Sequence, residues 1–150
     1  VRAEVIRVED DSVKVELENG HKIWVDDRIG VSKEIEGEEA VLTLVMAPGS
    51  VSADTREEIK DELCIESLGG DKLSCKIIGK VTGYDVEAEW PEAKSKFGYP
   101  LVELDVGPGK IVTAHENVPP VEEKQDYHGK GSKWKVSAKS LMLEGIEKLD

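Results

Sequence analysis

The segment 13–25 constrains the fold of this chain more than any other. In residues 13–17, apolar side chains alternate with charged ones, which is the period-2 pattern of a strand with one solvated face. Asn19-Gly20 follows at once, and because both residues tolerate a positive φ, the pair is a strong hairpin signal. The alternation resumes in residues 21–25. The segment therefore predicts a β-hairpin, the seed of an antiparallel sheet.

Further apolar runs flank this hairpin within residues 1–50. Apolar residues between 3 and 8 stand among charged ones before a turn at Asp10-Asp11. A loop with two glycines, 26–39, leads to the nearly continuous apolar run 40–46, which ends before Pro48-Gly49. We predict that residues 1–50 form a four-stranded antiparallel meander, the first of two small barrels.

Residues 51–70 have a different pattern. Asp54 followed three residues later by Glu57 matches a helical capping box, and Ile59 and Leu63 share one helical face. Gly69-Gly70 supplies the stop. The pattern predicts a short α-helix that connects the two halves of the chain.

Residues 71–150 are rich in strand signals again. The long run 73–90 contains Gly79 and Gly83, which predict a bend or bulge. Gly107-Pro108-Gly109 separates two apolar runs and predicts a turn.

A polar insertion at 91–98 and a long loop at 117–131 interrupt this half, and a last strand is expected from about Trp134 to Leu143. The predicted fold class is mostly β, with two small antiparallel OB-like or SH3-like barrels joined by a short α-helix.

Charge and length limit the partners. The net charge of −12 opposes broad binding to nucleic acid or to anionic lipid. No stretch approaches the roughly 18 to 20 apolar residues that cross a bilayer, so we expect no membrane insertion. No signal-peptide pattern is visible, and a cytoplasmic location is expected. The first residue is Val1 instead of Met, which suggests a processed protein or a piece of a larger one.

The two cysteines, Cys64 and Cys75, are too few for a disulfide scaffold and lack metal-site spacing. Reduced thiols are the expectation for a cytoplasmic protein. A bridge between them is the alternative for a heat-tolerant source, to which frequent Glu and Lys with little Asn and Gln also point.

Two stretches resemble TOBE domains, the small β-barrel modules of ABC-transporter ATPases and molybdate-binding proteins. The first comprises residues 13–20, 23–25, 36–38 and 41–48, and the second comprises 79–84, 101–107, 111–114 and 131–136. Counted from end to end, at 13–48 and 79–136, they span about two thirds of the chain. The insertion near Trp90 and the loop 117–131 depart from the minimal module, and no G-x-x-x-x-G-K-[ST] loop is present. The resemblance implies a regulatory or ligand-sensing module without its ATPase.

The segment 124–139 is a basic strip in an acidic protein. Five lysines stand there against one aspartate, interleaved with aromatic or imidazole rings. Cations alternating with flat rings are typical of sites that hold single-stranded nucleic acid. The other interpretation is a strand whose solvated face carries lysines. The candidate site residues in the strip are Tyr127, His128, Lys130, Lys133, Trp134 and Lys135.

Aromatic residues also gather around the polar insertion. Tyr84 and Trp90 precede it, and Phe97 and Tyr99 follow. Exposed aromatics are common anchors in ligand or protein contacts. They also close the ends of small barrels, so both interpretations stay open, and Tyr84 and Trp90 join the candidate site residues.

No catalytic or metal motif is found. The chain has no G-x-S-x-G elbow and no phosphate loop, and His21, His115 and His128 lack metal-ligand spacing. We therefore expect no cofactor and lean towards a non-enzymatic binding or regulatory module that recognises a partner protein or small ligand. The alternative is a single-stranded nucleic-acid or ribosome-associated OB protein that uses the strip Lys124–Lys139. The sequence does not predict an oligomeric state.

Overall fold

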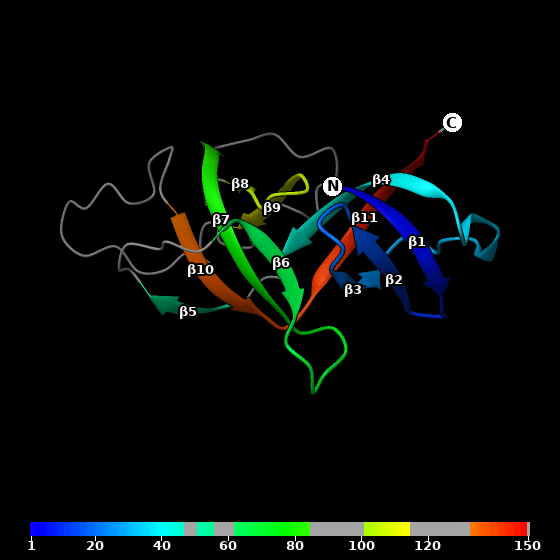
Figure 1. Ribbon diagram of the computed structural model, residues 1–150, viewed down its shortest axis with the longest axis horizontal. Helices are drawn as coiled ribbons and strands as arrows, with labels where there is room; N and C mark the ends of the chain where they lie inside the picture. Colours follow the sequence, from blue (N-terminus) through cyan, green and yellow to red (C-terminus); the bar gives the residue numbers. More distant parts are fainter. Residues whose placement is uncertain (47–50, 56–61, 85–100, 115–132, 150) are drawn as a thin grey trace.

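The computed structural model describes residues 1–46, 51–55, 62–84, 101–114 and 133–149, and these residues form mostly β-structure (Figure 1). Eleven strands and one short 3-10 helix follow one another along the chain. They are β1 (Arg2–Val8), β2 (Ser12–Leu17), β3 (Lys22–Asp27), η1 (Lys33–Ile35), β4 (Glu39–Met46), β5 (Val51–Thr55), β6 (Cys64–Ser67), β7 (Cys75–Tyr84), β8 (Leu101–Asp105), β9 (Lys110–Ala114), β10 (Lys133–Ala138) and β11 (Leu141–Lys148).

Five of these strands close into a barrel. β1, β2 and β3 form consecutive antiparallel pairs, and β4 returns to pair with the other side of β1. β11 lies between β3 and β4, parallel to β3 and antiparallel to β4, and completes the ring. Figure 1 shows β11, drawn in red, beside the blue and cyan strands of the chain's beginning.

The barrel forms because apolar side chains recur at every second position on its strands. Val5, Val13, Val15, Ile23 and Val25 are each at most 2% exposed, whereas Glu4, Lys14 and Trp24, which alternate with them, are half-buried or exposed. Burying this inner row of β-branched side chains is the main driving force for closure.

The predicted hairpin at Asn19-Gly20 is confirmed. The Gly20 N–H donates to the Leu17 carbonyl at 2.9 Å, and the Leu17 N–H donates to the His21 carbonyl at 2.8 Å. Gly20 has a φ of +87°, which glycine adopts without the steric penalty of a side chain.

The sheet continues from β4 through a short parallel pairing with β9, and we call this continuation the second sheet. Its order is β9-β8-β7-β10-β5, and β6 pairs with the first part of β7. The predicted turn at Gly107-Pro108-Gly109 is confirmed between β8 and β9, where the Val106 N–H donates to the Gly109 carbonyl. The predicted irregularity of the long strand is confirmed as a register shift between Val81 and Gly83.

Both sheets contribute to one hydrophobic core. Ile65, Ile77, Leu104 and Ile111 of the second sheet are at most 1% exposed and belong to the same buried cluster as the barrel interior. In the described residues, only the first sheet closes on itself, so the second barrel stays a prediction. No helix in the described ranges has the length and apolar character needed to cross a bilayer.

Two expectations about the strands need correction. Residues 1–50 do not form a simple meander, because β4 pairs with β1 and leaves the edge of β3 to β11. The last strand, expected from Trp134 to Leu143, is instead two strands separated by Lys139-Ser140. The break at these two residues lets β10 pair with β7 and β5, while β11 pairs with β3 and β4.

The predicted helix after Asp54 is also wrong in its described parts. Asp54 lies within β5, and Cys64–Ser67 forms β6, which pairs with β7. Residues 56–61 lie outside the described part of the chain. Pairing with the edge of an existing strand satisfies every second backbone group of β6, and this tertiary gain outweighs a local capping pattern.

The two cysteines are free thiols, and the alternative of a bridge between them does not hold. Cys64 lies opposite Ile78 and Cys75 opposite Ser67, so the strand register places them three positions apart. Three strand residues span about 10 Å, beyond the reach of a disulfide. Burial raises the pKa of the Cys75 thiol to about 12.

Candidate functional site

The outer surface of the barrel carries a row of cations that ends on an aromatic ring. The register places Arg7 of β1 opposite Lys14 of β2, and Lys14 opposite Trp24 of β3. Val13, Val15 and Val25 point into the core, so the residues that alternate with them face outward. Three neighbouring strands thus set Arg7, Lys14 and Trp24 side by side on a rigid support.

A cleft of about 640 Å³ lies over this row. We call it the Trp24 cleft. Its lining comprises Ile6, Arg7, Val8, Glu9, Asp10, Lys14, Trp24, Lys33 and Glu36. Its walls come from β1, β2, β3, the turn after β1 and the η1 region, so segments far apart in sequence form one surface.

Two lysines contact the indole of Trp24. The Lys72 Nζ lies 4.5 Å from the ring centroid, and the Lys14 Nζ lies 6.0 Å from it. Both distances fall within the range of cation–π attraction. Lys14 belongs to the lining of the cleft, whereas Lys72 contacts the lining residue Glu9.

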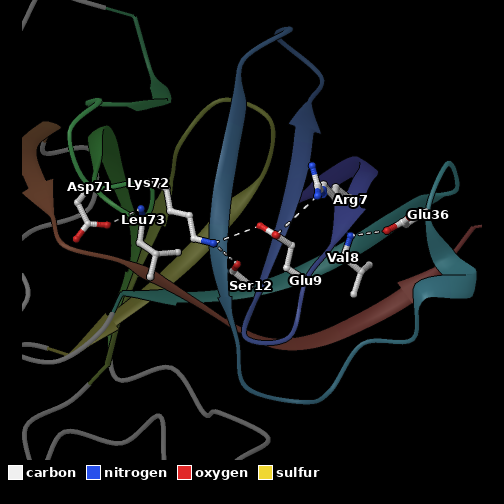
Figure 2. A network of polar contacts seen from close by, with 8 residues as sticks. All are labelled: Arg7, Val8, Glu9, Ser12, Glu36, Asp71, Lys72 and Leu73. Carbon is white, nitrogen blue, oxygen red and sulfur yellow. Dashed lines mark hydrogen bonds and ion pairs between the residues drawn. The ribbon is translucent and has the colours of Figure 1, made fainter.

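Lys72 belongs to the turn between β6 and β7, and it ties the second sheet to the barrel. Its ammonium donates to the Ser12 Oγ at 2.9 Å and to the Glu9 Oε1 at 3.4 Å. The other carboxylate oxygen of Glu9 lies 3.9 Å from the Arg7 guanidinium. Figure 2 shows Glu9 between the two cations. Lys72 and Glu9 therefore fix one end of the cation row.

The Asp71 carboxylate shapes the turn that presents Lys72. Its Oδ1 accepts the Leu73 N–H at 2.9 Å (Figure 2). Gly69 and Gly70, just before it, both have positive φ. The turn is therefore built from residues suited to a tight reversal, which places the ammonium of Lys72 on the barrel.

Glu36 forms the opposite wall of the cleft. The Val5 N–H donates to the Glu38 carbonyl, and the Val5 carbonyl accepts the Gly37 N–H. β1 is irregular after Val5, and there the edge of β1 that faces away from β2 has no strand partner in the described residues. The Val8 N–H at that edge donates to the Glu36 Oε1 at 2.8 Å (Figure 2). The Glu36 carboxylate thus takes the place of a strand carbonyl.

Some charged groups of the cleft have contact partners, and others have no ion pair in the described residues. Glu9 and Glu36 are engaged by Lys72, Arg7 and the Val8 N–H. In the part of the chain that the structure describes, neither Lys14 nor Lys33 makes an ion pair. Asp10, the third carboxylate of the lining, makes no ion pair either in the described residues. The lining therefore carries three cations and three carboxylates, and its lysines Lys14 and Lys33 are available to a ligand.

A second polar cluster joins the hairpin to β6. The Glu66 carboxylate lies 2.6 Å from the Lys76 Nζ and 4.0 Å from the His21 Nδ1. The hydrogen bond from Lys76 lowers the pKa of Glu66, and the charges of Lys76 and His21 act in the same direction. Among the described residues, no three His, Cys, Asp or Glu side chains gather as metal ligands would.

The structure places only part of the predicted site. Lys133 and Lys135 are half-buried in β10 and alternate onto the same side of that strand. Lys133 lies opposite the exposed Lys80 of β7.

The backbones of Trp134 and Tyr84 lie in β10 and β7, opposite Gly79 and Val102. Four candidates lie outside the described residues: Trp90, Tyr127, His128 and Lys130.

The sequence prediction missed Trp24 and its neighbours. One signal for them was available, because Trp24 occupies a solvated position of an alternating strand, between Lys22 and Asp26. A large aromatic residue on a polar face is unusual and points to a contact. The approach of Lys72, by contrast, depends on the pairing of β6 with β7 and has no local signal.

Comparisons with protein-family models, with curated proteins and with solved structures found no match to this chain. An inference about the ligand therefore depends on the residues of the cleft itself.

Proposed function

We propose that this chain is a non-enzymatic binding module that recognises a small ligand, or a segment of a partner protein, through the Trp24 cleft. The observation that carries the proposal is the row Arg7–Lys14–Trp24 under a cleft of about 640 Å³. This volume lies in the range of small-molecule sites, which combine apolar surface with a few placed polar groups. The sequence has no G-x-S-x-G elbow and no phosphate loop, which favours binding over catalysis.

We further propose that the barrel is of the OB type. Strands β4, β1, β2 and β3 lie in the spatial order of a Greek key, and β11 supplies the fifth strand. OB barrels bind ligands over the face of their second and third strands, where Lys14 and Trp24 lie here. This support is an analogy at the level of the fold. The resemblance to TOBE modules belongs to the same proposal.

A ligand screen that observes Trp24 directly tests the function. The chain has three tryptophans, so a nitrogen–proton correlation spectrum contains three indole signals, and Trp24→Phe identifies the one from Trp24. Small anions, sugars, nucleotides, short peptides and oligonucleotides are added in turn.

We expect at least one class to shift the Trp24 signal and to lose affinity in Trp24→Ala. If no class does so while the variant stays folded, the cleft is not a binding site.

The basic strip supports a second candidate function, the binding of single-stranded nucleic acid. Lys133 lies opposite Lys80, and Lys135 follows on the same side of β10, so three cations lie near one another on neighbouring strands. Fluorescence anisotropy of a labelled oligonucleotide at low salt tests this candidate. Binding that survives Lys133→Glu/Lys135→Glu unchanged, or no binding at all, excludes it.

A further inference from the structure

We propose that the ligand of the Trp24 cleft is a planar ring that carries a carboxylate or a phosphate. This inference rests on the proposed function, because it names the chemical class that the cleft recognises. Three features of the cleft support it: an indole in its lining, two lysines without an ion pair in the described residues, and the order of Arg7, Lys14 and Trp24 on neighbouring strands.

The half-buried indole of Trp24 belongs to the lining of the cleft. Lys72 lies 4.5 Å from the ring centroid and is held there by Ser12 and Glu9. Lys14, which also lines the cleft, is 6.0 Å away, which is the outer limit of cation–π contact. The indole is therefore a surface on which a flat ring in the cleft can stack.

Cations are available to an anionic ligand in this cleft. Lys14 and Lys33 make no ion pair in the described residues, and Arg7 has only a long contact of 3.9 Å with Glu9. The Glu9 carboxylate contacts Lys72, and the Glu36 carboxylate accepts the Val8 N–H. Asp10 also lines the cleft without an ion pair in the described residues, so the preference for an anion rests on position, because the register sets Lys14 and then Arg7 next to Trp24.

The placement of these groups joins the two requirements in one molecule. Arg7, Lys14 and Trp24 follow one another across β1, β2 and β3, where neighbouring strands lie about 4.8 Å apart. A ring stacked on Trp24 therefore brings a substituent over Lys14 and towards Arg7. A ring without charge, or an anion without a ring, uses only half of the surface.

Titration of the Trp24 indole signal with four probes tests the inference. Adenosine 5′-monophosphate and 2-naphthoate carry a ring with an anion of either kind, adenosine carries the ring alone, and inorganic phosphate carries the charge alone. We expect one or both ring anions to shift the Trp24 signal and to bind more tightly than adenosine or phosphate. Higher salt should weaken the ring anions and leave adenosine unaffected.

Substitutions in the cleft supply the second readout. Lys14→Gln and Lys33→Gln should each weaken the ring anion about two- to fivefold, as expected for exposed charge pairs, and leave adenosine unchanged. Lys110→Gln removes a comparably exposed lysine from the β8–β9 hairpin, outside the cleft, and should change nothing. The two other indole signals and the thermal midpoint report that each variant is folded.

The outcomes separate this inference from the proposed function. If both ring anions fail to shift the signal, or adenosine or phosphate binds as tightly, the inference is wrong. The proposed function then still stands if another class in the screen binds in a Trp24-dependent manner. If nothing in the screen does so, both proposals are wrong.

Discussion

Two glycines at hairpin tips allow a sharp test of how the sheets pack. Gly20 and Gly107 both have φ in the left-handed region, at +87° and +99°. A Cβ added at Gly20 meets no atom within 4 Å, whereas a Cβ at Gly107 lies 2.8 Å from the Leu63 carbonyl oxygen and 3.4 Å from its carbon. The same substitution therefore imposes conformational strain alone at one site, and strain plus a backbone clash at the other.

The expected losses differ by about 2 kcal/mol. A left-handed conformation costs a residue with a side chain about 1–2 kcal/mol, partly offset by the lower entropy of the unfolded chain when Gly becomes Ala. Gly20→Ala should therefore destabilise by about 1 kcal/mol. At Gly107, forcing an atom into occupied space adds about 1–3 kcal/mol, because the atom in the way belongs to backbone and cannot rotate aside. Gly107→Ala should destabilise by about 3 kcal/mol.

Urea unfolding followed by circular dichroism measures both values. For a chain of this length each 1 kcal/mol corresponds to about 2–4 °C in the thermal midpoint, so Gly107→Ala should lower it by about 6–12 °C and Gly20→Ala by about 2–4 °C. Equal losses in the two variants would refute the reasoning, because they would show that the β8–β9 turn is not seated against Leu63.

Three further predictions concern single groups. Glu36→Ala should destabilise by about 1 kcal/mol, because the Val8 N–H loses its acceptor, and hydrogen exchange of the Val8 amide should accelerate while that of Val13 does not. In the folded protein at pH 8, Cys75 should react with a thiol reagent more slowly than Cys64, because burial raises the pKa of Cys75 to about 12. The variants Cys64→Ser and Cys75→Ser each leave one thiol to be measured. Equal reaction rates would contradict the buried position of Cys75. The pKa of Glu66 is lowered in the folded state, first by the Lys76 hydrogen bond, so its contribution to stability is present above the ordinary pKa of Glu and is lost as the pH falls through the folded value. The stability difference between the native chain and Lys76→Met should therefore shrink below about pH 4, and a difference that stays constant with pH would exclude this origin.

The elements that the sequence predicts well are those with local causes. The hairpin at Asn19-Gly20 and the turn at Gly107-Pro108-Gly109 follow from residues that tolerate left-handed backbone next to alternating strands. The irregularity near Gly83 is equally local. In each case the signal and the structure lie within a few residues of each other.

The errors come from pairings between distant segments. Nothing near Asp54 shows that β5 pairs with β10, and nothing near β3 shows that β11 lies beside it. The candidate site failed for the same reason. Lys72 and Glu9 meet only because β6 pairs with β7 and the turn between them reaches the barrel, whereas the basic strip drew attention because its residues are neighbours in sequence.

The position of β11 has a consequence for how the chain matures. The barrel begins with the first residues, yet its ring stays open until residues 141–148 dock between β3 and β4, where Lys148 pairs with Ala40. During synthesis the edges of β3 and β4 that pair with β11 therefore stay unpaired until residues 141–148 have emerged. Contacts of such long range make folding slow, and a nascent chain stalled before Leu141 presents two apolar strand edges to any neighbour that can pair with them.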